Sequence, residues 1–279
     1  MTPSEREAIE RGFLATRAHA QRRAGWRQIG LGLVGVVIFL CLWEIAPRVL
    51  TGVNTKMFPP PSDTVRELYA MSFKTGEIWP HVAASLKRAV MGFLLGASLG
   101  VVIGVVTGRS TVLRQLSDPL LHGFRAIPAI AIVPLAIVWF GLGDLSKVML
   151  IAWGTFFPVW VNTFIGVRDL PPVYLRSAAS LGASRVQQIF LVALPAALPF
   201  VFAGLRQATA VAFVVLVAAE LVGAEQGLGY LISFAHLVFR VDVMFVGLIF
   251  LGAIGFAADH LFASLLTRLF PWYGGESRR

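Results

Sequence analysis

The chain has 279 residues, of which 57% are hydrophobic and 14% are charged, with a formal net charge of +9 at pH 7. This composition excludes an ordinary soluble domain. Several runs of about 20 apolar residues can each cross a bilayer core of about 30 Å, which predicts an all-α integral membrane protein with one transmembrane domain.

Catalytic and cofactor signatures are missing from the sequence. The one cysteine, Cys41, lies in an apolar run, which excludes an intrachain disulfide and a cysteine metal cluster, and the five histidines have no metal-ligand spacing. No Gly-x-x-x-x-Gly-Lys-Ser/Thr stretch occurs, so we expect no P-loop and no cofactor bound by this chain. Without a Ser/His/Asp or His-Glu-x-x-His arrangement, we do not expect an enzyme.

The first part of the chain combines a polar segment, a span and an amphipathic helix. Residues 1–27 hold six arginines and no signal-peptide core, so they are predicted to be a cytoplasmic segment. The first span is expected at 28–50. Within the loop 51–81, Pro59–Pro61 followed by Ser62 and Asp63 predicts a helix start, and the apolar positions that follow favour a short helix along the membrane interface.

The second predicted span contains regularly spaced glycines, and the third contains prolines. The second, expected at 82–107, has glycine at every fourth position from Gly92 to Gly108, and small residues at this spacing let another membrane helix approach closely. The third, expected at 118–140, contains Pro128 and Pro134, each of which removes a backbone hydrogen bond. We therefore expect a bent third helix that faces protein or a water path.

Three more spans complete a six-span domain. They are expected at 146–167, 195–222 and 242–266, with an outside loop and short helix at 223–241. The predicted inside segments hold 14 Lys and Arg residues against 4 in the outside loops, which puts both termini in the cytoplasm. The positive charge is then a topology signal and does not indicate nucleic acid. The predicted domains are a cytoplasmic segment 1–27, a permease domain 28–267 and a cytoplasmic tail 268–279.

Charged residues inside the spans are candidates for function, because a charge in the bilayer is costly. Arg125 and Arg206 fall in the inner parts of spans three and five, and Glu220 falls near the outer end of span five. Arg125 either lines a path or snorkels to the headgroups, and Glu220 is either a gate or a structural cap. For Glu44 and Asp259 we expect interhelical pairing or snorkelling.

The longest polar interruption in the second half of the chain runs from Tyr174 to Pro195. Pro171 and Pro172 favour a helix start, and Gly182 can take the left-handed conformation that ends a helix. A second amphipathic turn then leads into the fifth span. A short helix-Gly-helix between two spans is suited to press on something outside the membrane.

This stretch resembles the cytoplasmic loop of ABC-importer permeases, whose pattern is Glu-Ala-Ala, three residues, Gly, nine residues, Ile, any residue, Leu-Pro. The frame here is Arg176-Ser177-Ala178, Gly182, Val192 and Leu194-Pro195, with Arg in place of Glu and Val in place of Ile. The resemblance implies that this loop docks in a groove of a cytoplasmic ATPase. The docking residues would be Arg176, Ser177, Ala178, Leu181, Gly182, Ala183 and Pro195.

Further motifs are similar to the nitrate/sulfonate/taurine permease family, over roughly residues 58–273. They are Arg125 to Gly143, Phe157 to Thr163, Gly204-Leu205-Arg206, Ala219-Glu220 and Gly227-Leu228-Gly229-Tyr230. The resemblance implies a type I ABC importer permease in the bacterial inner membrane, with six spans and a coupling helix between spans four and five. Its expected partners are a second copy of itself, two ATPase subunits that hold ATP and Mg, a substrate-binding protein and membrane lipid. The expected pathway residues are Arg125, Pro128, Arg206 and Glu220.

Two other classes of function are weighed against this one. An ion-coupled secondary transporter would need no docking loop, and its inverted repeat is not visible. An intramembrane enzyme would need a polar cluster at matching depths, which is not visible either. The family implies a small anion such as nitrate, an alkanesulfonate or taurine, although relatives carry bicarbonate or pyrimidine-like precursors, and the sequence does not choose among them.

Overall fold

The computed structural model describes residues 30–49 and 57–269, and all regular secondary structure in these residues is helical. They belong to two compact units that divide between Arg66 and Glu67. The predicted cytoplasmic segment 1–27 and most of the predicted tail 268–279 lie outside the described residues.

The first unit contains an apolar helix, Gly30–Val49, and the start of α2 (Pro61–Tyr69). Glu44 is held here by three groups. Its carboxylate accepts the backbone N–H of Ser62 at 3.0 Å and the Ser62 hydroxyl at 2.8 Å, and it pairs with Arg48 one turn further along the same helix. Of the two arrangements predicted for Glu44, pairing is the one observed, and its partners lie on its own helix and on α2.

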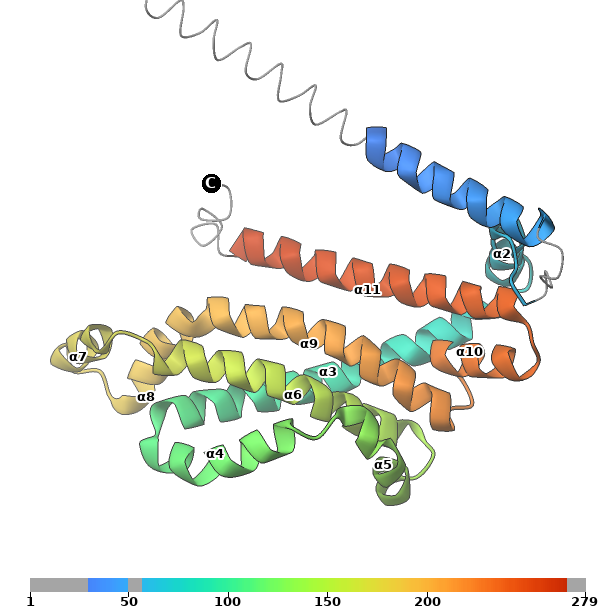
Figure 1. The fold of residues 1–279 in the computed structure, drawn as a ribbon. Helices are drawn as coiled ribbons and strands as arrows, with labels where there is room; N and C mark the ends of the chain where they lie inside the picture. Colours follow the sequence, from blue (N-terminus) through green and yellow to red (C-terminus); the bar gives the residue numbers. More distant parts are fainter. Residues whose placement is uncertain (1–29, 50–56, 270–279) are drawn as a thin grey trace, which may run out of the picture. The chain divides into compact units, whose positions relative to one another are not determined.

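The second unit is a bundle of long helices with short connecting ones (Figure 1). After a π-helical turn at Ala70–Lys74, its helices in chain order are α3 (Ile78–Arg109), α4 (Thr111–Arg125), a 3₁₀ turn (Ala129–Ile132), α5 (Val133–Phe140), α6 (Asp144–Arg168), α7 (Pro172–Ser180), α8 (Arg185–Gln188), a π-helical turn (Ile189–Ala193), α9 (Leu194–Gly223), α10 (Leu228–Leu237) and α11 (Val241–Leu269).

The described helices match a six-span membrane protein. The helix Gly30–Val49, α3, α6, α9 and α11 are each long and apolar enough to cross a bilayer. α4 and α5 provide a sixth crossing only as a broken pair, bent by 84°. The predicted six-span architecture is confirmed, and its third span is broken rather than continuous.

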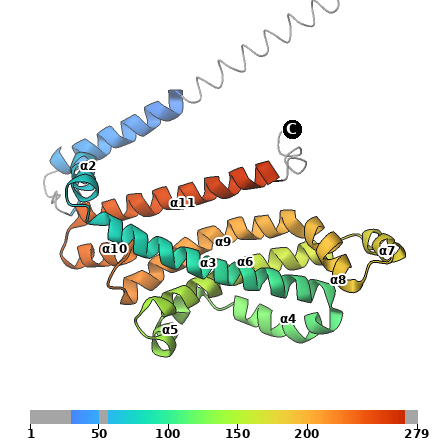
Figure 2. The same ribbon diagram turned by 180° about the vertical axis from the view of Figure 1, so that it is seen from behind.

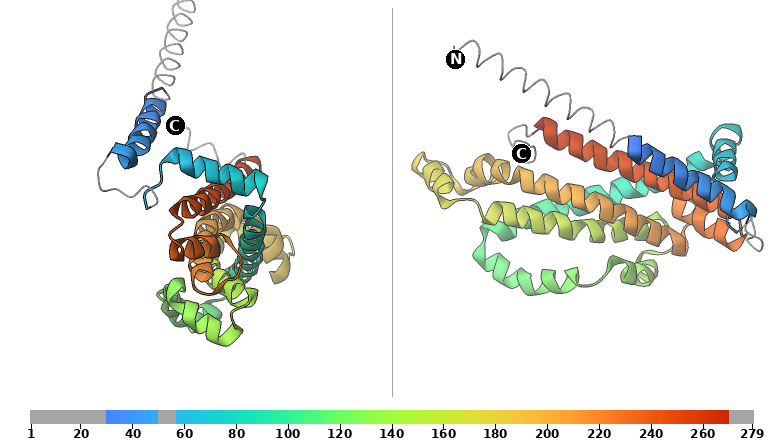
Figure 3. Two further views of the ribbon diagram at one scale, coloured as in Figure 1. Left: turned by 90° about the vertical axis from the view of Figure 1, so that its right-hand side faces the viewer. Right: turned by 45° about the horizontal axis from the view of Figure 1, so that its top comes forward.

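Within the second unit, α3, α6 and α9 form a central layer. α11 covers one side of this layer, and α4 and α5 lie on the other (Figures 1 and 3). α7 and α8 lie at one end of the layer and α10 lies at the opposite end, as Figure 2 also shows from behind. We name these the α7 end and the α10 end.

The glycine face of α3 packs directly on α6. A Cβ atom at Gly92 would lie 2.5 Å from Cβ of Ile151, and one at Gly104 would lie 2.7 Å from Cβ of Thr163. A Cβ at Gly96 would overlap both the Thr155 hydroxyl and a backbone carbonyl of α6. The predicted close approach of another helix is confirmed, because only glycine leaves room for it.

The third span differs from its prediction in where it starts and where it bends. α4 begins at Thr111, seven residues before the predicted start, because the Ser110 hydroxyl accepts the Leu113 N–H at 3.3 Å and caps the helix. Pro128 lies in the break, so the bend expected from it is confirmed. The bend expected from Pro134 is wrong, because this residue occupies the first turn of α5, where no backbone donor is needed.

Candidate functional sites at the two ends of the bundle

At the α7 end, the predicted helix-Gly-helix is present. α7 begins at Pro172 and ends at Ser180, and Gly182 follows with φ of +83°. The N–H of Ala183 donates to the Ala178 carbonyl at 3.0 Å, and the N–H of Gly182 donates to the Ala179 carbonyl at 3.0 Å. These two bonds are those of a Schellman motif, so Gly182 ends the helix as the sequence predicts.

The second half of this loop restarts as a capped helix. The Ser184 hydroxyl accepts the Gln187 N–H at 3.3 Å, and the Gln187 side chain accepts the Ser184 N–H at 2.8 Å, which forms a capping box. α8 continues through a π-helical turn into α9, with Pro195 in its first turn. The loop is therefore a defined structure that short connections join to α6 and α9.

The surface of this loop is apolar and largely uncovered. Leu181, at the turn, is 89% exposed, and Tyr174, Val186, Phe190 and Leu191 are also exposed. Among the predicted docking residues, Arg176, Ser177, Leu181, Gly182 and Pro195 are exposed, Ala183 is partly buried and Ala178 is buried. Tyr174 and Leu181 lie outside the apolar helices that are long enough to cross a bilayer, and exposed apolar side chains there indicate a protein contact surface.

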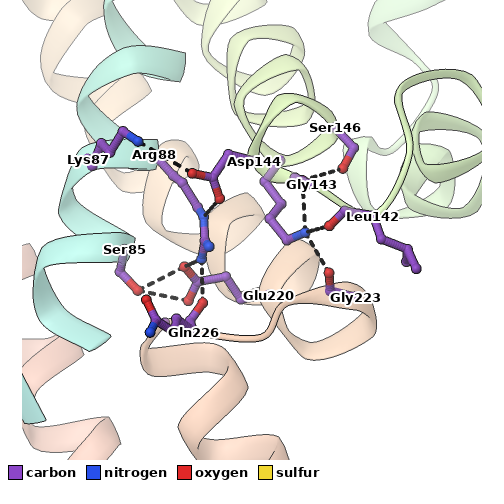
Figure 4. A network of polar contacts seen from close by, with 12 residues as sticks. Ser85, Lys87, Arg88, Leu142, Gly143, Asp144, Ser146, Glu220, Gly223 and Gln226 are labelled. Carbon is purple, nitrogen blue, oxygen red and sulfur yellow. Dashed lines mark hydrogen bonds and ion pairs between the residues drawn. The ribbon is translucent and has the colours of Figure 1, made fainter. Parts of the chain in front are cut away.

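At the α10 end, a buried carboxylate joins three segments (Figure 4). Glu220 of α9 is 1% exposed. Both of its carboxylate oxygens lie 2.8 Å from the Ser85 hydroxyl of α3, and one accepts the N–H of Gly229 at the start of α10 at 2.9 Å. Arg88 of α3 donates to the other oxygen at 2.8 Å.

Arg88 extends this network to α6. Its side chain is almost fully buried, yet its Nε donates to Asp144 at 2.7 Å and its Nη1 donates to the Gln226 carbonyl at 2.5 Å as well as to Glu220. Lys147 of α6 is 2% exposed and forms a second link, between α6 and α9, because its ammonium donates to the Gly223 carbonyl at the end of α9 at 2.6 Å. We name Ser85, Arg88, Asp144, Lys147 and Glu220 the polar cluster.

The loop that leads into α10 is fitted to the polar cluster. Gly227 has φ of +134°, and a Cβ there would overlap the Glu220 carboxylate. Its N–H donates to Nδ1 of His81 at 3.1 Å, and the His81 ring stacks on Tyr230 at 5.9 Å between centroids. The Ala219-Glu220 and Gly227-Leu228-Gly229-Tyr230 motifs, separate in the sequence, thus meet in one place.

The remaining predicted pathway residues lie apart from the cluster. Arg125 is the last residue of α4, and both it and Pro128 are exposed at the break. About 21 Å of helix separates Arg125 from Thr111, against the 10 Å expected for a start at 118. Arg206 is held by Asp259 of α11 through two hydrogen bonds of 2.7 and 2.9 Å, so interhelical pairing is the arrangement that Asp259 adopts.

The prediction missed Arg88 and Lys147, although both follow simple spacing rules. Arg88 precedes Gly92 by four residues, so it continues the glycine row that faces α6. Lys147 precedes Ile151 by four residues and continues the row of α6 that receives those glycines. A charge on such a contact face must be buried and paired, and this was the signal that could have identified both residues.

Known transport proteins are similar to this chain in sequence. The sequence pattern of the family described as binding-protein-dependent transport system inner membrane component matches residues 96–271. The taurine transport system permease protein TauC of Escherichia coli (strain K12) is 34% identical over 262 residues, covering 91% of this chain and 95% of TauC. The riboflavin transport system permease protein RibX of Chloroflexus aurantiacus is 35% identical over 256 residues, covering 92% of this chain and 94% of RibX.

The fold matches as well. A chain of the MetNI methionine ABC transporter, solved in an inward-facing conformation, has a TM-score of 0.55 at 20% identity, covering 68% of this chain and 93% of that chain. At this identity the likeness concerns the fold alone. Nothing in the comparisons supports an ion-coupled transporter. The chain therefore belongs to the family of binding-protein-dependent transport system inner membrane components, and it is a permease subunit of an ABC importer.

Proposed function

We propose that two copies of this permease form the pore of a type I importer, together with two cytoplasmic ATPase subunits and a substrate-binding protein. ATP and Mg would bind to the ATPase subunits and not to this chain. The family description supports an inner-membrane location, and the excess of Lys and Arg in the predicted inside segments supports cytoplasmic termini and a cytoplasmic α7 end. A six-span chain supplies half of a pathway, which supports a two-fold dimer.

The observation that carries this proposal is the shape of the α7 loop. Gly182 closes α7 in a Schellman motif and leaves Leu181 89% exposed, beyond the ends of α6 and α9. A helix end with an uncovered leucine can insert into a groove of an ATPase. ATP-driven closure of the two ATPase subunits would move the loops, and the short connections would pass this movement to α6 and α9. Release of ADP would reverse it.

For the cargo, we propose a small anion of the sulfonate type. The likeness to a taurine permease supports this class, and Arg125 supports it chemically, since a guanidinium donates a planar fork of hydrogen bonds to sulfonate oxygens. The Arg125 side chain is exposed and makes no hydrogen bond or ion pair within the described residues. The likeness to a riboflavin permease at similar identity makes riboflavin the comparison substrate.

Reconstitution tests the proposal. Proteoliposomes that hold the permease with its ATPase and binding protein should transport radiolabelled taurine only when ATP is present on the side of the membrane where the ATPase subunits lie. Uptake of riboflavin instead would overturn the substrate class, and ATP-independent uptake of either would overturn the ATP-driven mechanism.

A pair of variants at Gly182 tests the loop. Gly182→Val resists the left-handed backbone by about 1–2 kcal/mol, so the variant should insert normally but lose ATP-driven uptake and substrate stimulation of the ATPase. Gly182→Asn tolerates this conformation and should keep most of both activities. If Gly182→Val and the wild type show equal ATP-driven uptake and equal substrate stimulation of the ATPase, this loop has no role in coupling.

A further inference from the structure

The polar cluster borders a cavity at the α10 end, with a volume of about 700 Å³. The start of α3, the first residue of α6 and the connection between α9 and α10 form its wall. Figure 4 shows Lys87, Arg88, Asp144 and Gln226 of this wall. We name it the α10-end cavity. Its volume lies in the range of sites that take small molecules, and its wall is charged where such sites are usually apolar.

Arg88 places a fixed guanidinium on the wall of this cavity. Its side chain is only 7% exposed, because Nε donates to Asp144 at 2.7 Å and Nη1 donates to Glu220 and to the Gln226 carbonyl. The other terminal nitrogen, Nη2, makes no hydrogen bond within the described residues. A guanidinium that is held in place and still has free N–H donors is suited to bind an oxyanion.

Two further charges on the wall are exposed and available to a ligand. The ammonium of Lys87 lies 3.6 Å from the Asp144 carboxylate, and these side chains are 65% and 46% exposed. An ion pair this exposed contributes little to stability, so Lys87 can exchange it for an anionic ligand. The Glu225 side chain lines the cavity, is exposed and makes no hydrogen bond or ion pair within the described residues.

The charge balance of the wall decides which class of ligand fits. The wall carries two cations, Lys87 and Arg88, and two carboxylates, Asp144 and Glu225. A simple anion would be attracted by the cations and repelled by the carboxylates. A small zwitterion can place each of its charges beside an opposite charge, and this kind of complementarity gives specificity.

We propose that the α10-end cavity is an entry site for a zwitterionic aminosulfonate such as taurine. Arg88 and Lys87 donate hydrogen bonds to the sulfonate, and Glu225 accepts hydrogen bonds from the ammonium. In the proposed orientation the α10 end faces outward, so cargo meets this site before it passes between the spans. This inference rests on the proposed sulfonate cargo and narrows it to sulfonates that carry an amino group.

Ligand-observed NMR tests the site directly. The permease with its ATPase subunits is placed in nanodiscs without nucleotide or binding protein, and saturation transfer is titrated with taurine and with ethanesulfonate, which lacks the ammonium. Empty nanodiscs give the background. Ethanesulfonate should bind about two- to fivefold more weakly than taurine, the loss typical of one exposed ion pair. Equal affinities, or no binding of either ligand, would overturn the site.

Two variants assign the two ends of the ligand. Glu225→Gln should weaken taurine binding by about two- to fivefold without weakening ethanesulfonate binding, whereas Lys87→Gln should weaken binding of both. The matched controls are Glu77→Gln and Lys74→Gln, which remove exposed charges at the same end but outside the cavity and should change neither. Wild-type taurine affinity in both cavity variants would overturn the assignment.

Two other occupants of the cavity would give different results. The headgroup of phosphatidylethanolamine carries the same pair of charges, so nanodiscs with and without this lipid are compared. Equal taurine binding in both supports the cargo site, and loss of binding when the lipid is present assigns the cavity to the headgroup instead. Cavity variants that keep taurine binding but weaken binding of the substrate-binding protein would make the cavity a docking surface, which also overturns the cargo site.

Uptake measured on the same preparations separates this inference from the proposed function. ATP-driven taurine uptake by the wild type without detectable taurine binding overturns the entry site alone. Absence of ATP-driven taurine uptake by the wild type overturns the proposed function itself.

Discussion

At the scale of single residues, the chain is organised around buried charges and the small residues that accommodate them. Glu220 is compatible with the apolar bundle because Arg88 neutralises it and because the Ser85 hydroxyl and the Gly229 N–H donate to its oxygens. Gly227 and Gly229 are needed beside it, since a Cβ on either would come too close to this side chain. The Ala219-Glu220 and Gly227-Leu228-Gly229 motifs are therefore linked by one contact, in which the Glu220 side chain packs against the two glycines.

Gly227→Ala should lower stability, because the residue has φ of +134° and its added methyl group would overlap Glu220. A backbone region that is essentially restricted to glycine costs about 1–3 kcal/mol for other residues. Thermal unfolding in detergent, followed by tryptophan fluorescence, should show a lower midpoint. Gly143→Ala is the control, because Gly143 has extended backbone and open space around it, and equal losses in the two variants would contradict the prediction.

Arg125 stays a predicted pathway residue, and substitutions separate that role from anchoring at the headgroups. Arg125→Lys should keep part of the uptake rate, Arg125→Ala should slow uptake without affecting docking of the binding protein, and Arg125→Glu should be slowest because it repels the anion. Initial uptake rates at matched expression measure this order. Wild-type rates in all three variants would make Arg125 an interface anchor.

At the scale of helices, α6 is the central element of the second unit, with glycine contacts on two sides. The glycine row of α3 packs on one face, and a Cβ at Gly204 of α9 would lie 2.9 Å from Cβ of Asn162 on another. α6 also connects directly toward α7, with Arg168 bonded to Asp169 at 2.7 Å in the connection. This hydrogen bond lowers the pKa of the Asp169 carboxyl, so the Arg168–Asp169 ion pair persists at a pH where a free aspartate would already be partly protonated. Under the proposed mechanism, movement of the α7 loop would therefore reach the middle of the bundle.

Gly96→Ala should destabilise the α3–α6 contact, since even one methyl group meets the Thr155 hydroxyl and a backbone carbonyl. Overpacking of this kind costs about 1–3 kcal/mol. The unfolding midpoint in detergent should fall, whereas Gly252→Ala on α11, where nothing lies within 4 Å, should leave it unchanged or slightly higher. A fall of the same size in the Gly252 variant would mean that helix propensity, not packing, controls the result.

At the scale of the whole molecule, the two ends of the second unit have different chemistry, which fits a protein with two different partners. The α7 end presents exposed apolar side chains on a loop, and the α10 end is tied together by buried charges. Lys74 precedes α3 at the α10 end, where Met71 packs with Leu228 and Leu231, and Ser180 ends α7 at the opposite end.

Cysteine labelling tests the proposed orientation of these ends. In a Cys41→Ser background, a membrane-impermeant maleimide added to intact spheroplasts should label Lys74→Cys and leave Ser180→Cys unmodified. After permeabilisation both should react, because both positions are exposed. The reverse pattern in intact cells would place the α7 end outside and contradict the positive-inside assignment.

The sequence by itself determined the features that depend on local chemistry and on periodicity. Apolar runs fix where helices span a membrane, since every backbone group in lipid needs an internal partner. The glycine row of α3, the Gly182 turn and the break at Pro128 followed from backbone geometry at single positions. The start of α4 was misplaced because Arg109 and Arg114, on either side of the Ser110 cap, favoured an inside loop, although Val112, Leu113 and Leu116 already have the spacing of an amphipathic helix.

Only the tertiary structure decided which charges meet. Glu220 is separated from Arg88 by 132 residues and from Ser85 by 135, so no local rule pairs them. The choice between gate and cap for Glu220 depended on what the packing of α3 against α6 and α9 places beside it. Burial raises the free energy of an isolated charge, and the fold lowers it again by bringing the partners of these charges to the same depth.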